Sequence, residues 1–194
     1  IMDEIIIIGN GCSVLSKKNG KRVDKFSKVV RLGQFQIDGF EDYVGSKTDI
    51  ISTSHWKLNR NRLTKTKTII CVPFHYKEKY KQDELFINRD FKDLLDNILY
   101  VDTQEDYHYI WDNFKNINPP FKRGEVNFSL GFKTIFLIMK LFPDSKVTVT
   151  GFDFFKTGWY WRENHNRDIA NCHPYLYEKL YLKRMIIDKT IHLL

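Results

Sequence analysis

The chain has 194 residues, of which 42% are hydrophobic and 28% charged, with a formal net charge of +7. This is the composition of a globular protein, and we predict a single domain over residues 1–194. No apolar run approaches the ~20 residues that span a bilayer, which excludes a membrane-spanning helix, and the positive charge favours anionic partners. The three cysteines, Cys12, Cys71 and Cys172, are scattered and form no C-x-x-C pair. This pattern argues against a structural zinc site and predicts a reducing, cytoplasmic compartment.

Short β-branched runs alternate with stretches of helical periodicity along the chain. Four or five such residues are too few for a helix and suit buried strands, predicted for residues 5–8, 28–32, 49–53, 68–72, 98–101 and 146–150. Helices are predicted for residues 90–97, 103–114, 130–142 and 174–188. Thr103 with Asp106 three residues later indicates a variant capping box at the second helix.

This alternation predicts an α/β fold, a Rossmann-like domain with a mostly parallel sheet flanked by helices on both faces. Ligands of such sheets bind beyond the carboxyl ends of the strands. The loops after three of the predicted strands should therefore line one crevice: residues 9–11, 52–55 and 151–153.

The sequence Gly9-Asn10-Gly11-Cys12-Ser13 follows the first strand. Glycines let backbone N–H groups approach an anion, the Asn10 amide can donate and accept, and a helix beginning near Ser13 would point its positive end at a phosphate. The alternative is a tight strand-to-helix turn without a ligand, and the residues alone leave both open.

Four motifs in a fixed order resemble those of the sialyltransferase family. The large sialylmotif is matched over residues 5–50 by Gly9-Asn10-Gly11, Val23-Asp24, Val30-Arg31-Leu32-Gly33 and Gly39-Phe40-Glu41 through Thr48. The small sialylmotif is matched by Ser129-Leu130-Gly131, an apolar helix and residues 147–153. The third motif corresponds to residues 159–163, and the very small motif, a His followed five residues later by a Glu, to His173 and Glu178.

The resemblance implies a GT-A-like variant of the Rossmann fold and an inverting transfer of sialic acid from a CMP-sugar to a glycan or glycolipid, without a required cofactor or metal. It implies that His173 is the general base and that Tyr160 contacts the phosphate. The residues expected to hold the CMP donor are Gly9, Asn10, Gly11, Ser13, Gln34, Ser129, Leu130, Gly131, Gly151 and Phe152.

The chain departs from the family pattern at three points. Gly33 stands where the large motif has Asn, so Gln34 is expected to substitute, and Tyr160 or Trp161 stands where the third motif has His. The cysteine pair that joins the large and small motifs in animal enzymes is missing. These departures predict a bacterial or viral relative that works outside the secretory pathway.

The chemistry requires a base for the acceptor hydroxyl, and a neutral His173 suits it, although a packing or capping histidine is the alternative. Glu178 lies about 140° further round a helix and is expected to serve structure rather than to orient His173. Backbone N–H groups near Ser129 and Gly131 suit the departing phosphate. Asp153 either contacts the acceptor or caps a turn, and the sequence leaves both roles open.

Three other functions remain open from the sequence. The motifs indicate recognition of CMP but do not identify the sugar, so transfer of Kdo or another nonulosonic acid is an alternative. A second alternative is CMP binding without turnover. Nucleic-acid binding has no recognisable motif in this chain. Peripheral membrane association is also possible, with the basic stretch of residues 57–67 as one candidate contact.

Overall fold

The computed structural model describes residues 3–54, 66–71, 96–154, 156–162 and 173–194. In this part of the chain seven strands form one sheet, in the order β5-β4-β3-β2-β1-β6-β7, and every pair is parallel. Their bounds are β1 Glu4–Ile8, β2 Lys28–Leu32, β3 Ile50–Ser54, β4 Lys67–Cys71, β5 Ile98–Val101, β6 Lys146–Thr150 and β7 His192–Leu193.

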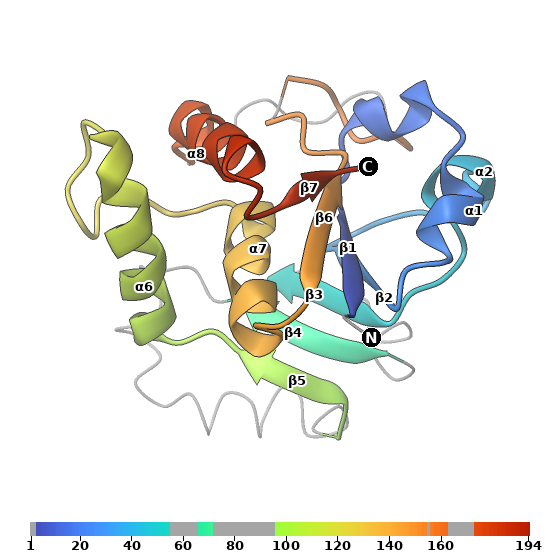
Figure 1. The fold of residues 1–194 in the computed structure, drawn as a ribbon, viewed down its shortest axis with the longest axis horizontal. Coiled ribbons are helices and arrows are strands. Elements are labelled where there is room, and N and C mark those ends of the chain that lie inside the picture. Colours follow the sequence, from blue (N-terminus) through green and yellow to red (C-terminus); the bar gives the residue numbers. More distant parts are fainter. Residues whose placement is uncertain (1–2, 55–65, 72–95, 155, 163–172) are drawn as a thin grey trace.

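Helices cover both faces of this sheet (Figure 1). Three longer helices lie on one face: α6 (Gln104–Phe114), α7 (Leu130–Leu141) and α8 (Tyr175–Ile187). Short helical segments lie toward the other face: the 3₁₀ helix η1 (Cys12–Ser16), α1 (Gly20–Val23) and α2 (Glu41–Val44). A further 3₁₀ turn, η3 (Lys115–Ile117), follows α6. The predicted parallel α/β architecture is therefore confirmed.

The isoleucine run of β1 explains why the sheet needs both layers. Ile5 and Ile7 belong to the apolar core beneath α6, α7 and α8, whereas Ile6 and Ile8 pack with the residues of η1, α1 and α2. Because successive strand side chains point to opposite faces, a strand covered on both sides carries an unbroken apolar run. All four side chains are buried.

The order of strands places a switch point between β1 and β6. After β1 the chain builds β2 to β5 on one side, and it returns to add β6 and β7 on the other. Gly9 and Gly151 follow these two strands at their carboxyl ends. A Cβ on Gly9 would come 2.3 Å from the carbonyl oxygen of Gly151, and Gly151 itself has φ of +72°. The two chain segments therefore approach closely where a ligand of a doubly wound sheet is expected.

The predicted elements agree with the structure to within about one residue at most ends. The capping box of α6 is confirmed, since the Thr103 hydroxyl accepts from the Asp106 N–H and the Asp106 carboxylate accepts from the Thr103 N–H. The helix expected near Ser13 is only the five-residue η1. The two-residue β7 and the short helices α1 and α2 were not predicted. Residues 90–95 of the predicted helix 90–97 lie outside the described residues.

The second half of the large sialylmotif has a structural task. The fully buried Arg31 guanidinium donates to the carbonyl oxygens of Val44, Gly45 and Lys47, the last at 2.8 Å. Asp24 accepts from the backbone N–H of Lys47 at 2.9 Å. These bonds fix the turn that leads into β3.

Candidate active site

A cavity of about 480 Å³ opens at the carboxyl ends of the strands. Its lining includes residues from the ends of β1, β2, β3 and β6, from the start of α7 and from the chain around the start of α8. The three loops that were expected to share one crevice each contribute to this lining, with Gly9, Ser54 and Gly151 respectively. That prediction is confirmed. Ten of the residues predicted to act or to bind the donor line this cavity: Gly9, Asn10, Gly11, Gln34, Ser129, Leu130, Gly131, Gly151, Phe152 and His173.

Several N–H groups of the turn after β1 are already paired within the fold. The N–H of Gly9 donates to the carbonyl of Thr150 at 2.7 Å, and that of Gly11 donates to the carbonyl of Gly151 at 2.9 Å. The N–H of Ser13 donates to the Asp153 carboxylate at 2.9 Å. These three donors tie the turn to the end of β6 and are not available to an anion, and Asp153 acts as the cap of the turn. The anion-binding role of the turn stays a prediction.

Asn10 is the group in this turn that faces the cavity with unused hydrogen-bonding capacity. Its Nδ2 donates to the carbonyl oxygens of Leu32 at 2.9 Å and Gln34 at 3.1 Å, which fixes the orientation of the amide. Its Oδ1 is buried and has no partner among the residues that the structure describes. A buried carbonyl oxygen left in this state is poised to accept from a ligand hydroxyl or amine.

The first turn of α7 offers backbone donors toward the cavity. The Ser129 hydroxyl accepts from the N–H of Phe132 at 3.3 Å and so caps the helix. Within the described residues the N–H groups of Leu130 and Gly131 have no partner, and both residues line the cavity. Unpaired N–H groups at the positive end of a twelve-residue helix suit a phosphate.

Glu178 holds the start of α7 from the neighbouring helix. Its carboxylate accepts from the Ser129 N–H and from the Ser129 hydroxyl, both at 2.7 Å. Burial raises the pKa of Glu178 to about 7. The Ser129 hydrogen bonds and the charge of Lys133 lower this pKa but offset only part of the effect of burial. The sequence-based expectation that Glu178 serves structure agrees with these contacts, although its partner Ser129 was not foreseen.

His173 lies two residues before α8 and lines the same cavity. Its Nδ1 is 2.6 Å from the carbonyl oxygen of Asn127. Because a carbonyl oxygen can only accept, this contact requires the proton on Nδ1 and leaves the lone pair of the neutral ring on Nε2. The contacts of His173 with Asn127 and of Glu178 with Ser129 join the start of α8 to the start of α7.

Lys133 is a cavity residue that the sequence reasoning missed. It lies one turn into α7, and its ammonium is 3.1 Å from the Asp102 carboxylate, with both side chains almost fully buried. A lysine near the start of a mostly apolar helix was the available signal. Its partner precedes α6 and could not be identified from spacing.

Two predicted site residues do not line the cavity. Ser13 lies in η1, where its N–H donates to Asp153, and the Tyr160 hydroxyl donates to the backbone carbonyl of Gln36. The Tyr160 ring is buried against Phe40. Trp159, next to Tyr160, does line the cavity. The roles assigned to Ser13 and Tyr160 in donor binding and phosphate contact stay predictions.

Over the described ranges, no group of three His, Cys, Asp or Glu side chains is arranged to hold a metal ion. No helix in those ranges is both long and apolar enough to cross a membrane.

The parallel sheet has a GT-A-like arrangement, and the cavity at its switch point is lined by His173 and by the start of α7. The chain belongs to the family described as Glycosyltransferase family 29 (sialyltransferase), whose model matches residues 2–190.

Individual relatives agree with this assignment. A human CMP-N-acetylneuraminate-beta-1,4-galactoside alpha-2,3-sialyltransferase is 36% identical over 87 residues, which are 45% of this chain and 19% of the human protein. The match thus spans about a fifth of the length of this curated relative. A mammalian sialyltransferase structure superimposes with a TM-score of 0.70 at 16% identity, covering 100% of this chain and 69% of that one. The sialyltransferase CstII from Campylobacter jejuni, in complex with a substrate analogue, cytidine-5'-monophosphate, gives a TM-score of 0.59 at 17% identity, covering 99% of this chain and 79% of that one.

Proposed function

We propose that this chain transfers sialic acid, or a closely related acidic sugar, from a CMP-linked donor to a hydroxyl of a glycan or glycolipid, with inversion at the anomeric carbon. The observation that carries the proposal is that His173 lines the same cavity as the unpaired N–H groups of Leu130 and Gly131. Family membership supplies the CMP donor.

In this reaction Nε2 of His173 removes the proton of the acceptor hydroxyl as its oxygen forms a bond to the anomeric carbon. The bond from that carbon to the phosphate oxygen breaks, and its electron pair leaves with CMP. The N–H groups at the start of α7 stabilise the negative charge that develops on the phosphate. Asn10 Oδ1 accepts from a donor hydroxyl or amine and helps to position the nucleotide.

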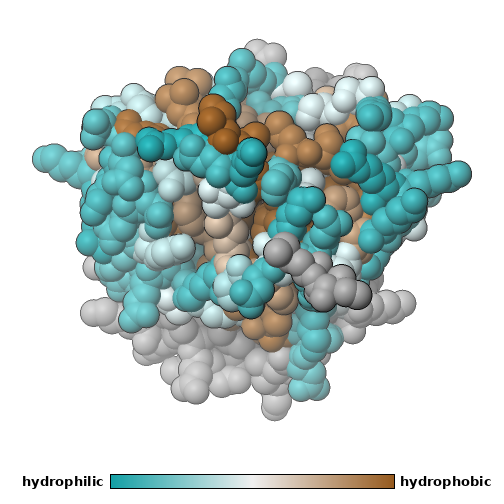
Figure 2. Space-filling model, viewed as in Figure 1, coloured by the Kyte–Doolittle hydropathy of each residue, from teal (hydrophilic) through white to brown (hydrophobic). Residues whose placement is uncertain are grey.

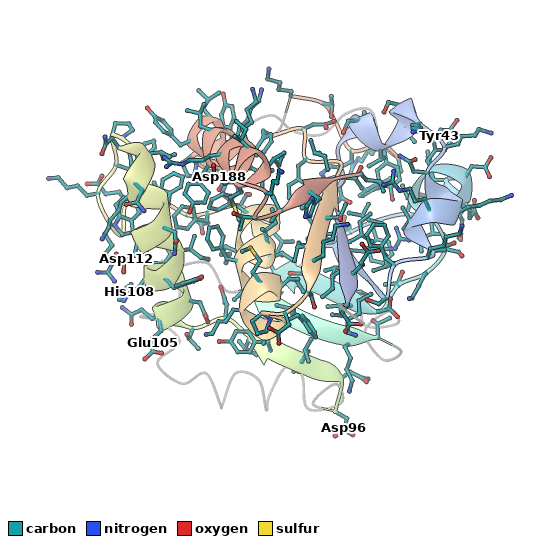
Figure 3. All side chains as sticks on the ribbon, viewed as in Figure 1. Tyr43, Asp96, Glu105, His108, Asp112 and Asp188 are labelled. Atoms are coloured by element: carbon teal, nitrogen blue, oxygen red, sulfur yellow. The ribbon has the colours of Figure 1, made fainter. Side chains whose placement is uncertain are left out.

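The test compares wild type with His173→Ala in transfer from CMP-Neu5Ac and in calorimetric binding of CMP. Transfer is expected to fall by roughly 10²–10⁴-fold, as for loss of a general base, with CMP affinity kept. His108→Ala is the matched control, because Figure 3 shows His108 on the outer side of α6, and it does not line the cavity.

Undiminished transfer by His173→Ala would remove the assigned base. CMP binding by wild type without transfer or donor hydrolysis would identify a binding domain without turnover. A panel that includes CMP-Kdo separates the remaining alternative, since preference for another acid would correct the sugar while keeping the site.

A further inference from the structure

The outward face of α8 is apolar where a surface helix normally carries polar residues. Leu176, Leu180 and Ile187, here named the apolar stripe, have exposed fractions of 54%, 54% and 77%. At 3.6 residues per turn these positions fall within about 40° of one direction, so they form one line along the helix. The opposite face is also apolar, because Leu182 and Met185 are buried in the core. Such a helix is hydrophobic on both sides, which is typical of one that has a further partner.

Lysines flank the apolar stripe. Lys179 and Lys183 belong to α8, and Lys156 comes from the loop after β6; these three are here named the lysine cluster. The pKa of Lys179 is lowered by its contact with Lys156 and by the nearby charge of Lys183, which indicates that like charges gather here. The acidic Asp188, labelled at the end of α8 in Figure 3, is 3.6 Å from Arg184, so that pair adds no net charge.

The face of α8 that carries the apolar stripe adjoins segments that line the cavity. Figure 2 shows apolar atoms among polar ones over the region that α8 occupies in Figure 1. The cavity residue His173 lies two residues before α8, and the loop that carries Lys156 also contributes Asp153 and Thr157 to the cavity lining. A surface in contact with α8 would therefore lie next to the site.

We propose that the apolar stripe and the lysine cluster form an interfacial docking surface for an anionic lipid bilayer. Apolar side chains flanked by lysines match the boundary between acyl chains and acidic headgroups, because burial of the stripe and attraction of the lysines act together. A cytoplasmic leaflet carries such headgroups. Docking brings the cavity close to the headgroup layer, and in the context of the proposed function this position suits a glycolipid acceptor.

The test is co-sedimentation of the chain with vesicles of neutral phosphatidylcholine and with vesicles that contain one part in four of phosphatidylglycerol. Wild type is expected to bind the anionic vesicles and to be released by salt. Leu176→Asn with Leu180→Asn, and separately Lys179→Gln with Lys183→Gln, should each lower partitioning on the order of tenfold.

Matched controls are Lys21→Gln with Lys25→Gln, two exposed lysines near α1 on the far side of the sheet, and Tyr109→Asn, an exposed apolar position on α6. Both should leave partitioning within about twofold of wild type.

Absence of binding to anionic vesicles overturns the proposal. It is also overturned if the control pair Lys21→Gln with Lys25→Gln loses as much partitioning as Lys179→Gln with Lys183→Gln. Concentration-dependent dimers that Leu176→Asn with Leu180→Asn disperses would also overturn it, by assigning the face to a second copy of this chain. CMP binding, measured in the same variants, is expected to be unchanged, so failure of docking and failure of the proposed function give different results.

Discussion

Glu178→Gln tests the buried contact that joins α8 to the start of α7. A glutamine amide has the shape of the protonated acid: its oxygen can accept from the Ser129 N–H, and its NH₂ can donate to the Ser129 oxygen, which then accepts. Both hydrogen bonds seen at 2.7 Å thus have a counterpart in the variant. What the variant removes is the ability of the side chain to ionise.

The expected effect follows from the pKa of Glu178, which burial raises from 4.5 to about 7. The folded chain then holds the proton after the unfolded chain has released it, so stability falls as the pH rises from 4.5 through 7 and is constant above. The difference in pKa corresponds to about 3 kcal/mol in the free energy of unfolding. Glu178→Gln should therefore approach wild type in stability near pH 5 and exceed it by a few kcal/mol at pH 8.

Urea unfolding from pH 5 to pH 8 measures this difference directly. Glu105→Gln is the control, because Glu105 is an exposed glutamate in the first turn of α6, labelled in Figure 3. The reasoning is refuted if the difference between Glu178→Gln and wild type does not change with pH, or if the control changes by the same amount.

Three further substitutions test the neighbouring contacts. Gly9→Ala should lower the unfolding free energy by about 3 kcal/mol in urea, because the new Cβ would meet the Gly151 carbonyl; unchanged stability contradicts this close approach. Asn10→Asp replaces an amide that donates twice with a negative charge, so calorimetry should give CMP binding at least roughly tenfold weaker. Lys133→Met leaves the Asp102 carboxylate buried without its ion pair and should cost about 3 kcal/mol in thermal or urea unfolding, whereas adding Asp102→Leu should recover most of the loss.

Local patterns were sufficient for most of the sheet. A β-branched run such as residues 5–8 between turns can only be buried on both faces, and glycine at its end marks the carboxyl edge where the cavity lies. A two-residue strand such as β7 carries no such pattern. Its pairing with β6 depends on the position that α8 gives to the end of the chain.

The site was less accessible to sequence reasoning because its decisive contacts join distant segments. The motif led to Asn10, Ser129 and His173, which line the cavity. It did not reveal that Asp153 takes up the N–H of Ser13, a contact across 140 positions. Contacts of this kind take up N–H groups that the sequence alone would leave free for an anion, since hydrogen-bonding capacity depends on partners brought in by the fold.

The place of β1 between β2 and β6 has a consequence for biosynthesis. The pairing of Ile5 with Val147 cannot form until residue 147 has left the ribosome, 142 residues after Ile5. Until then the edge of β1 that pairs with β6 in the folded sheet has no partner strand. An unpaired edge of isoleucines is prone to associate with other chains. We therefore expect truncated chains that end before residue 146 to aggregate, and the cavity to form only after β6 has been synthesised.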